Sequence, residues 1–169
     1  ELTAARAQSL PVVLPLASIT KVMTAITALS FAPETTEVTI GADALRMEGD
    51  SGLKQGERWL LRDLLTFTLV ESSNDGAVAV SSAIGAALAT STEGTGAYRA
   101  EFIIAMNELS RTLGLTSTVF LNESGLDIDE TRAGAFSSAR DVALMLAHAL
   151  EDFPSVFTET RLHELELTS

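Results

Sequence analysis

Cysteine is absent from this 169-residue sequence, and histidine occurs only twice. Without cysteine, the chain cannot use thiol catalysis, a disulfide scaffold or a thiolate metal site, and its redox compartment stays open. His148 and His163 lack metal-ligand spacing, so we interpret them as surface or core residues and expect neither a metal nor another cofactor. Two such histidines also make a Ser-His-Asp triad a poor explanation of any activity.

Basic residues are scarce as well. The chain has 11 Lys and Arg against 23 Asp and Glu, and its formal net charge is 11 − 23 = −12. A chain this acidic is a poor partner for nucleic acid or for an anionic membrane surface. No apolar run approaches the roughly 20 residues of a membrane span, and the sequence that begins at Glu1 shows no signal segment or membrane anchor. Because the sequence begins with Glu1 rather than Met, we interpret it as a processed or trimmed chain.

The residues that are present suit one globular domain over residues 1–169, since 46% are hydrophobic and 20% are charged. Pro11 and Pro15 favour an extended lead-in. Apolar periodicity then predicts five helices, at 18–29, 59–70, 77–88, 98–113 and 138–152. Alternation predicts short strands at 37–40, 119–121 and 161–167. A chain this rich in helix supplies few partners for its strands, so we expect an α/β fold whose sheet is incomplete.

Ser18 and Lys21 stand at the start of the first expected helix, three residues apart on one face. A lysine with a lowered pKa could remove the proton of the serine hydroxyl, and the serine's own N–H could meet a developing oxyanion. A helix-capping serine beside a solvated lysine explains the same spacing. Ser51 and Lys54 repeat the Ser-x-x-Lys spacing, but in a glycine-rich stretch where no helix would hold the pair together.

A second polar cluster, Ser72-Ser73-Asn74-Asp75, separates two very apolar helices. Ser72 and Asn74 can point to the same side of a turn, where one could pass a proton and the other could hold an amide. The alternative is a plain helix–helix link, with Ser73 or Asn74 as the cap of the next helix.

Four ordered segments, at 14–25, 71–75, 120–127 and 137–143, resemble the serine-type D-alanyl-D-alanine carboxypeptidases, the low-molecular-mass penicillin-binding proteins of the S11 peptidase type. The resemblance extends from residue 14 to about residue 150. It implies a DD-peptidase/β-lactamase-like fold in the bacterial cell envelope, outside the cytoplasmic membrane. It also implies an enzyme that trims peptidoglycan stem peptides ending in D-Ala-D-Ala and that β-lactams acylate.

The resemblance implies roles for four residues. Ser18 would be the acylated nucleophile and Lys21 its general base. Ser72 would relay a proton to the departing amine, and Asn74 would bind the substrate amide and help to hold Lys21.

One family motif is missing. Related acylating enzymes combine Ser-x-x-Lys with a Ser-Asp-Asn motif and a Lys-Thr-Gly motif. This chain contains no Lys-Thr-Gly and, besides Lys21 and Lys54, no further lysine. We therefore expect a partial domain that holds mainly the helical portion, and its activity as an isolated fragment stays open.

Three other functions compete with carboxypeptidase activity. A class A β-lactamase would need a deacylating Glu in a Glu-x-x-Leu-Asn stretch, but Thr118 stands three residues before Leu121-Asn122. A peptidoglycan DD-endopeptidase could use the same motifs. A non-catalytic wall-binding or scaffold module is the alternative from a different class, favoured if the whole gene also lacks Lys-Thr-Gly.

Overall fold

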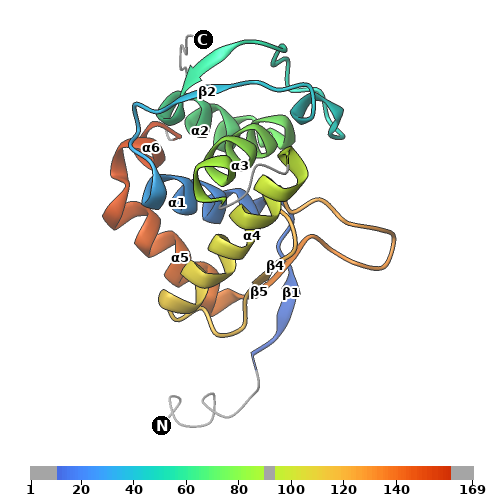
Figure 1. The fold of residues 1–169 in the computed structure, drawn as a ribbon. Coiled ribbons are helices and arrows are strands. Elements are labelled where there is room, and N and C mark those ends of the chain that lie inside the picture. Colours follow the sequence, from blue (N-terminus) through green and yellow to red (C-terminus); the bar gives the residue numbers. More distant parts are fainter. Residues whose placement is uncertain (1–10, 90–93, 161–169) are drawn as a thin grey trace, which may run out of the picture.

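The computed structural model describes residues 11–89 and 94–160, and it is rich in helix (Figure 1). The helices are α1 Thr20–Phe31, α2 Leu61–Val70, α3 Asn74–Leu88, α4 Thr95–Thr112, α5 Ala139–Asp152 and α6 Pro154–Glu159. The strands are β1 Val13–Pro15, β2 Glu37–Thr39, β3 Arg58–Leu60, β4 Val119–Phe120 and β5 Ala135–Ser138. Short 3-10 turns occur at Ala17–Ile19 and Ala44–Arg46.

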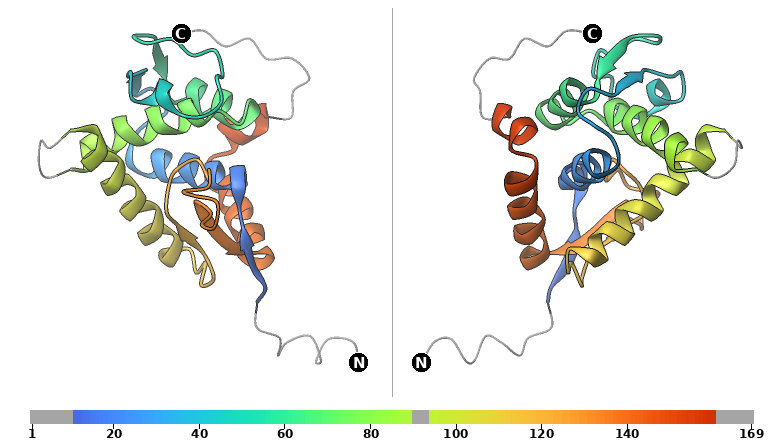
Figure 2. Two further views of the ribbon diagram at one scale, coloured as in Figure 1. Left: turned by 90° about the vertical axis from the view of Figure 1, so that its right-hand side faces the viewer. Right: turned by 60° about the vertical axis from the view of Figure 1, so that its left-hand side comes forward.

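Helix α1 lies at the centre of the molecule and contacts α2, α3, α4 and α5 (Figure 2). The sequence of α1 explains this central position, because its own small and apolar residues occur on all sides of the helix instead of forming one stripe. The buried positions include Met23, Ala25, Ile26 and Ala28, together with three threonines and Lys21. A lysine inside this helix is an exception that the packing must accommodate.

The strands form two small antiparallel sheets at opposite ends of the helical layer (Figure 2). One has the order β1-β5-β4, in which β5 pairs with both neighbours. The other is the β2-β3 pair, in which Val38 lies opposite Trp59. Among the described residues, the strands are few and short, as the sequence predicted for an incomplete sheet.

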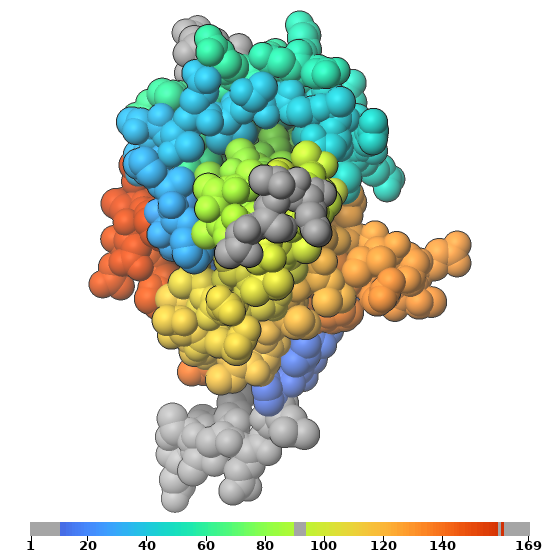
Figure 3. Space-filling view, in the orientation of Figure 1, coloured from blue at the N-terminus to red at the C-terminus, as the bar shows by residue number. Residues whose placement is uncertain are grey.

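Two polar anchors tie the three-stranded sheet to the helices. The side chain of Asn107 on α4 both accepts from the N–H and donates to the C=O of Phe120 in β4, at 3.0 and 2.8 Å. Ser138 caps α5 by accepting from the N–H of Asp141 at 3.2 Å, as the sequence predicted. The chain from 127 to 132 extends from this sheet as an exposed turn, the orange projection in Figure 3.

The predicted helices are present, with differences at their ends. Residues 58–60 form a strand, so the prediction that the helix begins at Trp59 was wrong: Trp59 pairs with β2, and α2 starts at Leu61. Helix α3 begins at Asn74, three residues before the predicted start, because Ser73 caps it. The short helix α6 and strand β5 were not predicted. The predicted strand at 161–167, with His163, lies outside the described residues.

No helix in the described segments is both long enough and apolar enough to cross a membrane.

Candidate active site

Ser18 is an exposed residue in the 3-10 turn that leads into α1. The N–H of Leu16 donates to the C=O of Ala135, which ties this lead-in to β5. The following Ala17 has a φ of 46°, a left-handed conformation that L-residues seldom adopt. The first N–H groups of a helix have no acceptor within it, so the turn presents donors as well as the Ser18 hydroxyl.

Lys21 lies beneath Ser18 and is only 2% exposed. Its ammonium nitrogen Nζ is 3.0 Å from Ser18 Oγ and donates to the C=O of Ser124 at 2.9 Å. Burial lowers the pKa of Lys21 from 10.5 to about 8, because a buried site disfavours the charged form. The interpretation of Lys21 as a solvated lysine is therefore wrong, and a base of this pKa can be partly neutral near physiological pH.

The Ser124 carbonyl comes from a tight turn that the sequence did not mark as part of the site. Asn122 Oδ1 accepts from the N–H of Gly125 at 2.7 Å, and Asn122 Nδ2 donates to the C=O of Leu126 at the same distance. Gly125 has a φ of 81°, and a Cβ there would lie 1.9 Å from the C=O of Ala17. The turn is thus packed directly against the peptide that precedes Ser18.

Ser72 and Asn74 lie at the junction of α2 and α3. Ser72 is exposed and has a φ of 54°. The Asn74 side chain donates to the C=O of Glu48 at 2.8 Å, and Ser73 rather than Asn74 caps α3 by accepting from Gly76. Lys21 Nζ is hydrogen-bonded to Ser18 and to the C=O of Ser124, and the part of Asn74 in holding Lys21, which the resemblance implies, stays a prediction.

Backbone strain marks both parts of the candidate site. Among the described residues other than glycine, only Ala17 and Ser72 have a positive φ. Such a conformation costs about 1–3 kcal/mol and persists where the surroundings enforce it, often at functional sites. One strained residue precedes the candidate nucleophile, and the other is the candidate proton relay.

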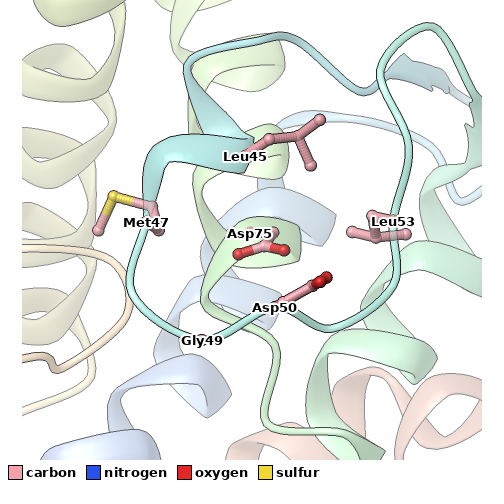
Figure 4. Close-up of a pocket in the computed structure, with 6 residues that line it drawn as sticks. All are labelled: Leu45, Met47, Gly49, Asp50, Leu53 and Asp75. Atoms are coloured by element: carbon pink, nitrogen blue, oxygen red, sulfur yellow. The ribbon is translucent and has the colours of Figure 1, made fainter.

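The loop from Glu48 to Ser51 is fastened to the start of α3. Ser51 Oγ is 2.8 Å from Ser73 Oγ and donates to Asp75 Oδ2 at 3.1 Å. The loop carries a pocket of about 300 Å³ lined by Leu45, Met47, Gly49, Asp50, Leu53 and Asp75. Figure 4 shows the carboxylate of Asp75 facing the inside of this loop. A smaller adjoining pocket shares Gly49 and Asp50 and reaches Ser72 and Asn74.

The second Ser-x-x-Lys pair has no comparable geometry. Ser51 is bonded to Ser73 and Asp75, whereas Lys54 is exposed and its backbone N–H donates to Glu57. Of the two lysines, only Lys21 is placed as a candidate base. Within residues 11–89 and 94–160, no group of three or more acidic or histidine side chains could hold a metal ion.

Comparison with known proteins identifies related sequences and structures. The model of the D-alanyl-D-alanine carboxypeptidase family, Peptidase S11, matches residues 6–168. D-alanyl-D-alanine carboxypeptidase DacC of Escherichia coli is 30% identical over an aligned length of 153 residues, and the match covers 83% of this chain and 34% of that protein. The similarity agrees with the resemblance predicted from the motifs.

Solved structures give the same fold. A D-alanyl-D-alanine carboxypeptidase from Mycobacterium tuberculosis superposes with a TM-score of 0.76 at 28% identity, covering 94% of this chain and 55% of that one. The Streptomyces K15 DD-transpeptidase superposes with a TM-score of 0.74 at 25% identity, and the match covers 89% of this chain and 56% of the transpeptidase chain. The chain thus spans about a third of that curated relative and about half of these solved chains, which confirms the helix-rich, incomplete DD-peptidase fold.

Proposed function

The chain belongs to the D-alanyl-D-alanine carboxypeptidase family, and from this we propose that it is the helical part of a serine hydrolase acylated on Ser18. The observation that supports this most is the contact of Ser18 Oγ with the buried Lys21 Nζ at 3.0 Å. The substrate would be a peptidoglycan stem peptide that ends in D-Ala-D-Ala. The reaction would take place in the bacterial cell envelope, outside the cytoplasmic membrane.

In the first step, Ser18 Oγ attacks the carbonyl carbon between the two D-alanines. The hydroxyl proton passes to the neutral amine of Lys21, which the lowered pKa makes available. The carbonyl oxygen becomes an oxyanion, and the unpaired N–H groups at the start of the Ser18 turn are suitable donors to it.

In the second step, the tetrahedral intermediate collapses and the bond to the terminal D-alanine breaks. The leaving nitrogen takes up a proton, which Ser72 would relay from Lys21. Asn74 would bind the amide of the peptide beside the cleaved bond. Its present bond to Glu48 fixes the side chain next to Ser72, in the pocket that both residues line.

In the last step, water attacks the acyl ester and gives a proton to Lys21. The bond between the acyl carbon and Ser18 Oγ breaks, Lys21 returns the proton to Oγ, and the shortened peptide leaves as a carboxylic acid. A β-lactam would acylate Ser18 by the same attack and remain bound where water attack is slow. The Lys-Thr-Gly motif that related enzymes use is absent from this chain, so turnover would require the full-length protein to supply it.

Labelling of the full-length protein with a fluorescent penicillin tests this proposal. We expect Ser18→Ala and Lys21→Ala each to abolish labelling, because one removes the nucleophile and the other its base. Lys54→Ala is the matched control and should label like the unmodified protein. Labelling that survives Ser18→Ala, or that is lost equally in both lysine variants, contradicts the assignment.

Product analysis distinguishes the reaction type. The full-length protein should release free D-alanine from a peptide ending in D-Ala-D-Ala. Cleavage of a cross-linked peptide dimer without that release would instead show an endopeptidase. If the full-length protein neither labels nor cleaves, the wall-binding or scaffold module becomes the better explanation.

A further inference from the structure

An ion pair between a buried carboxylate and a partly exposed arginine involves the residue that precedes Ser124, whose carbonyl contacts Lys21. The Glu123 side chain is fully buried, and its Oε1 accepts from Nε of Arg99 on α4 at 2.8 Å. A second guanidinium nitrogen of Arg99 is 2.7 Å from the same oxygen. Glu123 Oε2 has no hydrogen-bond partner among the described residues, and the ion-pair partner of Glu123 among them is Arg99.

The main chain of the same segment is bonded to α1. The C=O of Glu123 accepts from Thr24 Oγ1 at 2.6 Å, and the next C=O, that of Ser124, accepts from Lys21 Nζ at 2.9 Å. The side chain of Glu123 is therefore fastened to α4 while its backbone is fastened to α1. The peptide that carries the Ser124 carbonyl is fixed from both sides.

We propose that Glu123 and Arg99 are positioning residues, which hold the Ser124 carbonyl where it directs Lys21 Nζ toward Ser18. This inference rests on the proposed function only in giving Lys21 the role of a base. An ion pair with a buried carboxylate is a weak source of stability, since replacing both partners by apolar side chains of similar size is often neutral or stabilising. The role that we assign to the ion pair of Glu123 and Arg99 is therefore to orient the neighbouring Ser124 carbonyl.

Other buried carboxylates near α1 are bonded elsewhere. Asp75 on α3 accepts from Ser51, and Asp141 on α5 accepts from Ser117 and Thr118. Of these carboxylates, Glu123 is the one whose neighbour in sequence, Ser124, supplies the carbonyl that accepts from Lys21.

The test measures the titration of Lys21 directly in this chain, labelled with ¹³C at the lysine ε-carbons. The chain has two lysines, so NMR should give two titrating signals, with Lys54 as the internal reference. In Glu123→Met we expect the Lys21 midpoint to fall by roughly half a pKa unit, about a threefold change in its dissociation constant. The Ser124 carbonyl that stabilises the ammonium form of Lys21 is then held less firmly in place, whereas the midpoint of Lys54 should not move.

Glu123→Gln should lie nearer to the unmodified protein, because its amide oxygen can still accept from Arg99. Glu37→Met is the matched control, since it breaks the exposed pair with Arg58 and should leave Lys21 unchanged. If Glu123→Met does not fold, Glu123→Leu offers a second apolar replacement. An unchanged Lys21 midpoint in folded Glu123→Met, or in folded Glu123→Leu, overturns the proposal.

A second measurement uses penicillin labelling of the full-length protein. Glu123→Met should slow labelling of the folded protein about tenfold, and Glu123→Gln should recover most of the rate. Equal rates in all three proteins would overturn the positioning role. If the unmodified protein does not label, the proposed function fails, but the NMR titration still decides the positioning proposal.

Discussion

Lys21 combines two properties that rarely occur together, a charged side chain and a place inside the central helix. Spacing predicted its proximity to Ser18, because residues three apart share a helix face. Spacing could not predict Ser124, which is 103 residues away in sequence and contributes only its backbone carbonyl. The resemblance marked residues 120–127 without giving any of them a role, so this half of the Lys21 environment required the fold.

The lowered pKa of Lys21 predicts how folding stability depends on pH. In the unfolded chain Lys21 keeps its proton up to about pH 10.5, whereas in the folded chain it loses the proton near pH 8. Between these values the unfolded state binds more protons, so the free energy of unfolding should rise with pH. At about 1.4 kcal/mol per pKa unit, the rise would be of the order of 2–3 kcal/mol.

Urea unfolding at pH 7.5, 8.5 and 9.5 would measure this rise. Lys21→Met should remove it, while Lys54→Met, which replaces an exposed lysine, should keep it. A rise of the same size in Lys21→Met would mean that another group causes the pH dependence and that the lysine pKa is not lowered.

The helices and strands of this chain differ in how well the sequence predicts them. Helix α5 was predicted to within a residue, since Ser138 caps a strongly periodic segment. Strand β3 was missed because Trp59 and Leu60 continue the apolar spacing of α2, and only pairing of Trp59 with Val38 reveals the strand. Pairing across 21 residues is a property of the fold, and no local pattern contains it.

Helices α3 and α4 approach each other closely at Gly85, a contact that gives a sharp prediction. A Cβ at Gly85 would lie 1.9 Å from the C=O of Tyr98, which is backbone and cannot turn away. Gly85→Ala should therefore destabilise the fold by roughly 1–3 kcal/mol, the usual cost of overpacking.

The same substitution at Gly96 is the matched control. Gly96 also lies in a helix, but apart from its chain neighbours and the backbone of its own helix no described atom lies within 4 Å of its Cβ position. Gly96→Ala should stabilise the protein by about 0.5–1 kcal/mol, because alanine favours the helix over the unfolded chain. A urea midpoint that falls in Gly85→Ala and rises in Gly96→Ala, relative to the unmodified protein, would confirm the close helix contact. A rise in both variants would contradict it.

At the scale of the whole molecule, charge and apolar surface act against each other. The net charge of −12 repels copies of the chain from one another. On the β1 side, however, Val12 and Leu14 are 71% and 60% exposed. Leu14 also lines an apolar pocket of about 300 Å³ together with Ile19 and Val142. Among the described residues β1 pairs only with β5, so its other edge has no strand partner.

An exposed apolar strand edge favours pairing between copies, and the repulsion that opposes it is screened by salt. We therefore predict that the chain self-associates more in 1 M than in 0.05 M sodium chloride, as sedimentation velocity at several protein concentrations would show. Replacing Val12 and Leu14 by lysine puts charge on the edge and should abolish the association.

Lysine at the exposed positions Ile104 and Val70 is the control, because neither residue belongs to β1. An equal loss of association in this control would mean that general surface hydrophobicity, and not the β1 edge, causes the association. If association instead falls as salt is added, charge attraction between copies joins them, and the β1 edge does not.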